Sequence, residues 1–239
     1  MKKYFLTIAL ILSSLYLAGQ EPGRILIFSA TKGFRHSSIE IGRNAISRLC
    51  IENHIQCDST ENPADFNDQF LGKYDVIIFL NTTGDLFNET QQKALQKYIH
   101  NGGGWVGIHA ATDAEYEWVW YGKLAGAYFK SHPEQQEAIV RVTARDHIAT
   151  RMLPAEWRRY DEWYNYKGVN KDLEVLAYLD ESSYKGGEMD NQHPIVWYHE
   201  FEGGKAFYTG FGHTDATFQD PLFMEHLLGG IKLASRSRK

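Results

Sequence analysis

Cysteine is nearly absent from the 239-residue chain, which has only Cys50 and Cys57. They fall near the end of an expected helix and in the strand that follows it. Such positions favour packing as small apolar residues over reaction as nucleophiles. If the protein is exported, a disulfide between Cys50 and Cys57 remains an alternative to two free thiols, because oxidising compartments maintain such bonds. The sequence therefore does not point to cysteine chemistry.

Clusters of lysine or arginine are also missing, and acidic residues outnumber basic ones by 30 to 25. An acidic chain without a basic patch argues against nucleic acid as a partner. The sequence has no internal repeat, no low-complexity segment and no linker. We therefore expect a single domain over residues 20–239, a length that suits one α/β core.

Close-spaced metal ligands are lacking as well. Neither His-x-His nor His-Glu-x-x-His occurs in the chain, and these are the local patterns that most directly indicate a metal site. A divalent metal held by residues from distant strand ends is possible but not indicated. No other cofactor is evident.

The first residues have the pattern of a secretory signal peptide. Lys2 and Lys3 precede an apolar run over residues 4–12, and small residues follow to residue 19. The run is short for a membrane span, which disfavours an uncleaved anchor. Removal of residues 1–19 changes the formal charge from −5 to −7, and no cysteine follows to take a lipid. We expect an exported, periplasmic protein without membrane contact after cleavage.

Strands and helices alternate through the first half of the chain. Apolar strands are expected at residues 24–30, 74–80 and 104–108 with a weaker one at 54–59, and helices at residues 39–52 and 89–100. We expect Ser37 and Ser38 to cap the first helix and Asn88 the second. This order predicts a parallel, doubly wound α/β sheet with helices on both faces.

The second half predicts a different arrangement. It contains an aromatic segment with helical character, several strand patterns and a closing helix. The expected elements are a helix over residues 116–129, strands at 138–143 and 173–178, a hairpin formed by 193–200 and 204–213, and a helix over 221–235.

Histidines and acids stand where several of these strands or turns end. The residues concerned are His36, His109, the pair Asp161 and Glu162, and His213. In an open α/β sheet, ligands bind beyond the carboxyl ends of the strands, and histidine can donate or accept a proton near neutral pH. His213 joins the others only if residues 204–213 run parallel to the preceding strands. We predict that His36, His109, Glu162 and His213 are catalytic.

Four further side chains are expected to contact substrate. Asp113 follows His109 at the start of the next element, His132 can close over the site, and Asp161 precedes Glu162. Trp118 can form a stacking surface together with neighbouring aromatic residues, although core packing is the commoner role. The remaining histidines are interpreted as structural, namely His54, His100, His147, His199 and His226.

Five segments resemble the ThuA-like family, named for trehalose utilisation: residues 33–36, 102–111, 161–162, 193–197 and 204–213. The resemblance covers nearly the whole mature chain. It implies a flavodoxin-like fold of the class I glutamine amidotransferase-like kind. It also implies a role in bacterial sugar catabolism beside oxidoreductases that act on disaccharides through 3-keto intermediates, and it adds His193 to the expected substrate contacts.

One segment departs from the superfamily. Amidotransferases carry Gly-x-Cys-x-Gly at this turn, whereas residues 107–111 read Gly-Ile-His-Ala-Ala. An imidazole cannot replace a thiolate that forms a thioester with glutamine, so we expect no glutaminase activity.

Three functions stay open at this point. The leading hypothesis is acid–base catalysis of an isomerase, lyase or hydrolase type on a sugar or 3-keto-disaccharide. In it, His109 and His36 lie around the carbonyl, Glu162 is the base, and His213 is a second donor or ligand. The alternatives are a non-catalytic sugar-binding or accessory module, which serves a sugar oxidoreductase, and a metal-dependent hydrolase. The sequence predicts neither the substrate's identity nor the oligomeric state.

Overall fold

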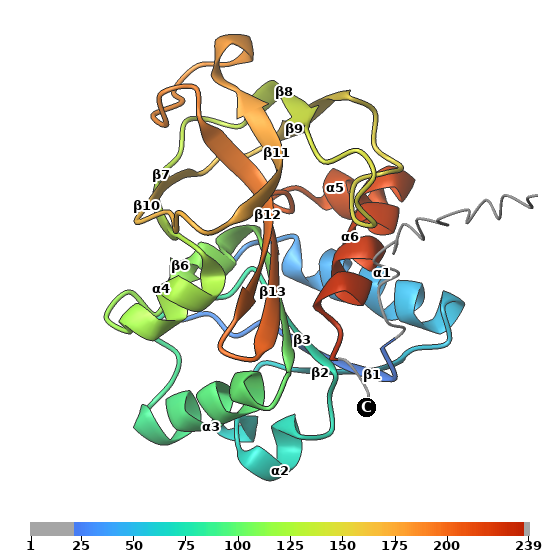
Figure 1. Ribbon diagram of the computed structural model, residues 1–239, viewed down its shortest axis with the longest axis vertical. Helices are drawn as coiled ribbons and strands as arrows, with labels where there is room; N and C mark the ends of the chain where they lie inside the picture. Colours follow the sequence, from blue (N-terminus) through green and yellow to red (C-terminus); the bar gives the residue numbers. More distant parts are fainter. Residues whose placement is uncertain (1–21, 237–239) are drawn as a thin grey trace, which may run out of the picture.

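The computed structural model describes residues 22–236, so the expected signal peptide at residues 1–19 lies outside the described residues (Figure 1). Within residues 22–236, no helix combines the length and hydrophobicity that a membrane span requires. Cys50 and Cys57 are both free thiols, and Cys50 is buried, as expected for a small apolar side chain in a core.

A nine-stranded sheet forms the centre of the molecule (Figure 1). Five neighbouring strands run parallel, in the order β2 (Gln56–Thr60), β1 (Arg24–Phe28), β3 (Val76–Leu80), β5 (Gly104–Ile108) and β13 (Gly204–Thr209). This is the strand order of flavodoxin-like folds. The predicted α/β fold is therefore confirmed, with β13 as the fifth parallel strand.

The sheet continues beyond β13 with antiparallel strands, so it is mixed and not parallel throughout. These are β12 (His193–Phe201), β11 (Glu174–Asp180), β8 (Gln136–Val142) and β9 (Glu156–Asp161). The predicted hairpin is formed by β12 and β13, and a tight turn of this kind can join only antiparallel strands.

Helices cover both faces of the sheet (Figure 1). One face packs against α1 (Ile39–Glu52), α5 (Asp215–Gln219) and α6 (Pro221–Ala234), and the other against α2 (Asp68–Leu71), α3 (Glu89–His100) and α4 (Val119–Ala125). Within β5, Trp105 joins one core, while Val106 and Ile108 join the other. Successive side chains of a strand point to opposite faces, and both faces of the central parallel strands are buried. Their sequences are therefore continuous hydrophobic runs.

The expected helix starts have two different outcomes. Asn88 caps α3 in a capping box. Its side chain accepts hydrogen bonds from the backbone N–H groups of Thr90 and Gln91, and the Gln91 side chain accepts one from the Asn88 N–H. Ser38 precedes α1 but makes no capping bond. Its hydroxyl donates instead to the Gly212 carbonyl, 2.9 Å away, so the predicted cap is wrong and Ser38 connects two loops.

The predicted helix over residues 116–129 is too long at both ends. In the structure the helix is α4, which begins only at Val119. Gly126 ends it, because this glycine adopts a left-handed conformation with φ of 89°. The following residues form β7 (Tyr128–Ser131), which pairs with β10 (Asn165–Lys167). The remaining short elements are β4 (Thr83–Gly84), β6 (Asp113–Ala114) and the 3₁₀ turns η1 (Pro63–Asp65), η2 (His109–Thr112) and η3 (Glu181–Ser183).

Candidate functional site

Three parallel strands each deliver a histidine to the same edge of the sheet. His36 follows β1, His109 follows β5, and His213 follows β13. Strand β13 runs parallel to β5, which is the condition that brings His213 to the other two. Glu162 follows β9 and reaches the same place from the far side of the sheet. We call His36, His109, Glu162 and His213 the His–Glu cluster.

The four side chains of the His–Glu cluster are in mutual contact. Oε2 of Glu162 lies 3.0 Å from Nδ1 of His213 and 3.4 Å from Nε2 of His109. Those two nitrogens are 3.3 Å apart. The His36 ring stands 5.0 Å from each of the other two histidine rings, centroid to centroid. One chelating atom from each of the four residues fits within 4.8 Å of all the others.

His109 sits in a strained turn. Its φ is 47°, a left-handed value that is uncommon for a residue with a side chain and that recurs at functional sites. Nδ1 lies 3.1 Å from the Gly210 carbonyl. Because a carbonyl only accepts, Nδ1 carries the hydrogen, and Nε2 faces Glu162 and His213. The ring also packs on Tyr164, with centroids 4.2 Å apart.

Asp161 fixes the turn that carries His213. Its carboxylate accepts hydrogen bonds from the backbone N–H groups of Gly212 and His213, at 3.0 and 3.1 Å, and from the Thr217 hydroxyl at 2.8 Å. The side chain is fully buried. With its oxygens occupied in this way, Asp161 positions the turn of His213, and its role as a substrate contact stays a prediction.

Asn81 is a site residue that the sequence did not single out. Its amide donates to the Gly212 carbonyl at 3.1 Å and to the Ser38 hydroxyl at 3.0 Å. The bonds join the loops after β1, β3 and β13 behind the histidines. A signal was present, because Asn81 is the first polar residue after the apolar run of β3 and therefore falls at the carboxyl edge of the sheet.

Burial and mutual charge set the protonation of the cluster. Burial lowers the pKa of His36 to about 3, and the neighbouring His109 and His213 act in the same direction, so the ring is neutral near pH 7. Burial by itself raises the pKa of Glu162. However, hydrogen bonds from His109 and His213, with their positive charge, outweigh that effect and hold the pKa well below its usual range. Glu162 is therefore ionised.

Two of the predicted substrate contacts lie at the rim of the cluster. Nδ1 of His132 is 3.3 Å from the second carboxylate oxygen of Glu162, and 42% of the His132 side chain is exposed. Asp113 accepts a hydrogen bond from the Tyr116 hydroxyl at 2.5 Å. Burial raises the Asp113 pKa, while the charges of His109 and His132 lower it. These contacts leave both residues available to a ligand that reaches Glu162.

His193 lies outside the cluster. It is fully buried, with Nε2 2.8 Å from the Tyr164 carbonyl and Nδ1 3.0 Å from a Glu181 oxygen. Both ring nitrogens are thus engaged by protein groups, and the substrate contact expected of His193 stays a prediction. In the structure His193 holds the segment of Tyr164, the residue on which the His109 ring packs.

Trp118 also lies outside the cluster. Its ring stacks on Trp120 and Tyr121, with centroids 5.0 and 6.0 Å apart, and the Trp120 indole donates to Glu202. The predicted stacking surface exists, but these partners belong to α4 and to the β12–β13 turn. Trp118 packs on these neighbours, and its contact with a substrate stays a prediction.

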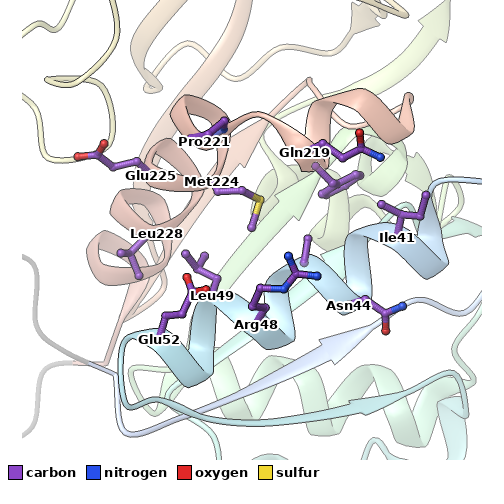
Figure 2. A pocket seen from close by; sticks show the side chains of 12 residues that line it. Ile41, Asn44, Arg48, Leu49, Glu52, Gln219, Pro221, Met224, Glu225 and Leu228 are labelled. Carbon is purple, nitrogen blue, oxygen red and sulfur yellow. The ribbon is translucent and has the colours of Figure 1, made fainter.

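A surface groove of about 690 Å³ runs along the outer side of the junction between α1 and the helices α5 and α6 (Figure 2). Its lining includes Leu49 and Arg48 from α1 and Met224 and Leu228 from α6. None of the cluster residues lines this groove. The groove is therefore a feature of the helical face, separate from the chemistry at the sheet edge.

Comparison with known proteins now places the chain in a family. The model of the ThuA family, described as trehalose utilisation, matches residues 24–234. The chain belongs to the ThuA family. A search of curated proteins finds no match to this ThuA-family chain.

Solved structures agree with this assignment. A putative ThuA-like protein from Bacteroides uniformis is 27% identical, with a TM-score of 0.74 and coverage of 87% of this chain and 89% of that one. Another, from Parabacteroides merdae, is 19% identical with a TM-score of 0.74, covering 92% and 93%. A β-galactosidase from Bacillus circulans shares 12% identity at a TM-score of 0.58, over 90% of this chain and 31% of that one, and shows the fold alone.

Proposed function

We propose that this ThuA-family protein is an exported enzyme of carbohydrate catabolism whose His–Glu cluster performs acid–base chemistry on a keto sugar, with a 3-keto-disaccharide as the preferred substrate class. The observation that supports it is the convergence of three histidines and one ionised glutamate at the carboxyl edge of the sheet. Perturbed titratable groups gathered at such an edge are typical of catalytic sites.

A ketone makes this chemistry accessible to side chains alone. The carbonyl acidifies the C–H bond of the carbon beside it, so a base can remove that proton and leave an enolate. The enolate then expels the glycosidic oxygen from the next carbon, and an acid donates a proton to the departing oxygen. The products are an unsaturated keto sugar and a free sugar, and addition of water to the double bond completes a net hydrolysis.

We propose a role for each member of the cluster. About 8% of the Glu162 side chain is exposed, so a substrate can reach its carboxylate, which we assign as the base that receives the carbon-bound proton. His213 is 16% exposed and can donate a proton to the leaving oxygen. His109 is fully buried behind them. It therefore acts through Glu162 and His213 as a positioning residue, while neutral His36 closes the site from the β1 side.

The first test is turnover of a 3-keto-disaccharide by the purified mature protein. Wild type is expected to release the free sugar, and Glu162→Gln to lower the rate by about a hundredfold or more, because the substituted amide cannot accept the proton. His100→Gln serves as the matched control, since that ring is exposed and pairs with Glu202 away from the cluster. Glutamine is expected to yield no ammonia, because residue 109 is not a thiol.

The same assay separates the enzyme from a sugar-binding module. Calorimetric binding of the keto sugar without turnover, and unchanged in Glu162→Gln, would reject catalysis. It would instead identify a protein that delivers substrate to a sugar oxidoreductase. Loss of turnover with retained binding in Glu162→Gln is the result that the proposal requires.

A further inference from the structure

We propose that the His–Glu cluster binds one divalent first-row transition-metal ion through a ring nitrogen each of His36, His109 and His213 and the carboxylate of Glu162. The inference deepens the proposed function, on which it rests for its biological setting: with the ion bound, Glu162 and His213 are ligands, and a water on the ion takes over the proton transfers assigned to them above. The sequence did not indicate this site, since its ligands come from four separate segments of the chain.

The spacing of three ligand atoms matches a coordination polyhedron. Nε2 of His109, Nδ1 of His213 and Oε2 of Glu162 form a triangle with edges of 3.0, 3.3 and 3.4 Å. In a tetrahedral site with bonds of about 2.0–2.1 Å, neighbouring ligand atoms lie about 3.3 Å apart. A ring nitrogen of His36 within 4.8 Å of these atoms supplies the fourth ligand.

The protein already orients two of these ligands from behind. The Gly210 carbonyl holds a hydrogen of His109 on Nδ1 and turns Nε2 toward the centre of the triangle, where an incoming metal ion would replace any proton on Nε2. Nε2 of His213 lies 2.7 Å from the Gln135 side-chain amide, which can accept its hydrogen after a rotation of the amide group. Metal-bound histidines characteristically use their second nitrogen in this way.

His36 provides an independent indication. The residue is 3% exposed, and its Nδ1 is buried with no hydrogen-bond partner among the described residues. A buried polar atom without a partner is costly, so native proteins rarely leave one.

The donor set selects the class of ion. Three imidazoles and one carboxylate suit zinc, iron, cobalt, nickel or manganese, whereas calcium and magnesium prefer oxygen ligands. With four protein ligands in place, such an ion would take a carbonyl oxygen or a water as a fifth ligand, and would then polarise the carbonyl or lower the pKa of the water. Partial exposure of His213 and Glu162 leaves a side from which the ion and a substrate oxygen can approach.

The test measures metal alone, without substrate. The full mature protein is stripped with a chelator and titrated with ZnCl₂ by calorimetry and with CoCl₂ by visible absorption. We expect one equivalent of Zn²⁺ to bind and Co²⁺ to give the d–d bands of a low-coordinate site. Glu162→Gln and His109→Asn, whose asparagine tolerates the left-handed backbone, should each weaken Zn²⁺ binding at least tenfold. His100→Gln should bind like wild type.

The outcomes separate this inference from the proposed function. Absence of stoichiometric Zn²⁺ and Co²⁺ binding in folded wild type overturns the metal site, whatever the turnover. Binding that survives both cluster substitutions also overturns it, because the ion must then lie elsewhere. One equivalent bound at the cluster without turnover of a keto sugar supports the metal site and rejects the proposed function.

Discussion

The buried histidines differ in whether both of their ring nitrogens have hydrogen-bond partners. Burial lowers the pKa of His36 to about 3 and leaves its Nδ1 without a partner among the described residues. Burial likewise lowers the pKa of His226 to about 4, but that ring is held between the Ala149 carbonyl and the Thr209 hydroxyl. His226 is therefore a structural residue with satisfied nitrogens, whereas His36 has an atom to spare for a ligand.

His226 predicts an acid limit on stability. Its folded pKa is depressed from about 6.5 to about 4, so between these values the unfolded chain binds a proton that the folded one does not. The free energy of unfolding therefore falls as pH drops through this window. His226 contributes a loss of roughly 2–3 kcal/mol between about pH 7 and pH 4.5.

Urea denaturation of wild type and His226→Gln at the two pH values measures this contribution. The variant is expected to lose less stability on acidification, while His100→Gln, at an exposed ring, should follow wild type. Parallel losses in wild type and His226→Gln would show that the proton binds elsewhere.

At the scale of elements, the turn after β13 determines where His213 points. Gly212 has a φ of 121°, and a Cβ at this position would lie 2.7 Å from the Ile108 side chain. Its N–H donates to Asp161, and its carbonyl accepts from Ser38 and Asn81. Any side chain here must displace β5 or the turn, so the glycine is required by both conformation and space.

Gly212→Ala is expected to destabilise the fold by about 2–4 kcal/mol and to weaken cluster function, since it combines backbone strain with a steric clash. Gly168→Ala is the matched control. That glycine also has a positive φ, of 64°, but no atom lies within 4 Å of the place that a methyl group would take, so only about 1 kcal/mol of strain applies. Equal losses of unfolding free energy in the two variants would contradict the role of the close approach to Ile108.

At the scale of the whole molecule, the sequence was sufficient for the part of the fold in which neighbouring segments pack together. Continuous apolar runs indicated buried parallel strands, and a histidine after each of three strands indicated a shared edge. Glu162 follows β9, at the opposite end of the sheet from β2. The sequence singled out Glu162 as an acid where a strand or turn ends, but its return to the cluster depends on the path of the antiparallel strands, which periodicity does not encode.

The departures from the sequence predictions share a physical cause. The sequence placed Asp161 and His193 near the substrate, but it does not show that backbone N–H groups, or the carboxylate of Glu181, already bond to their polar atoms. Ser38 stands at the capping position of α1, but its hydroxyl donates to the Gly212 carbonyl. Trp118 forms the expected aromatic stack at α4, away from the cluster.

The most direct test of the central claim, that the His–Glu cluster moves a carbon-bound proton of a keto sugar, is hydrogen exchange followed by NMR in D₂O. Wild type is expected to replace the hydrogen beside the ketone of a 3-keto sugar with deuterium, even when no leaving group departs. Glu162→Gln should exchange at least a hundredfold more slowly, and His100→Gln at the wild-type rate. Exchange at the same rate in wild type and Glu162→Gln, or none above the solvent background, would contradict the account.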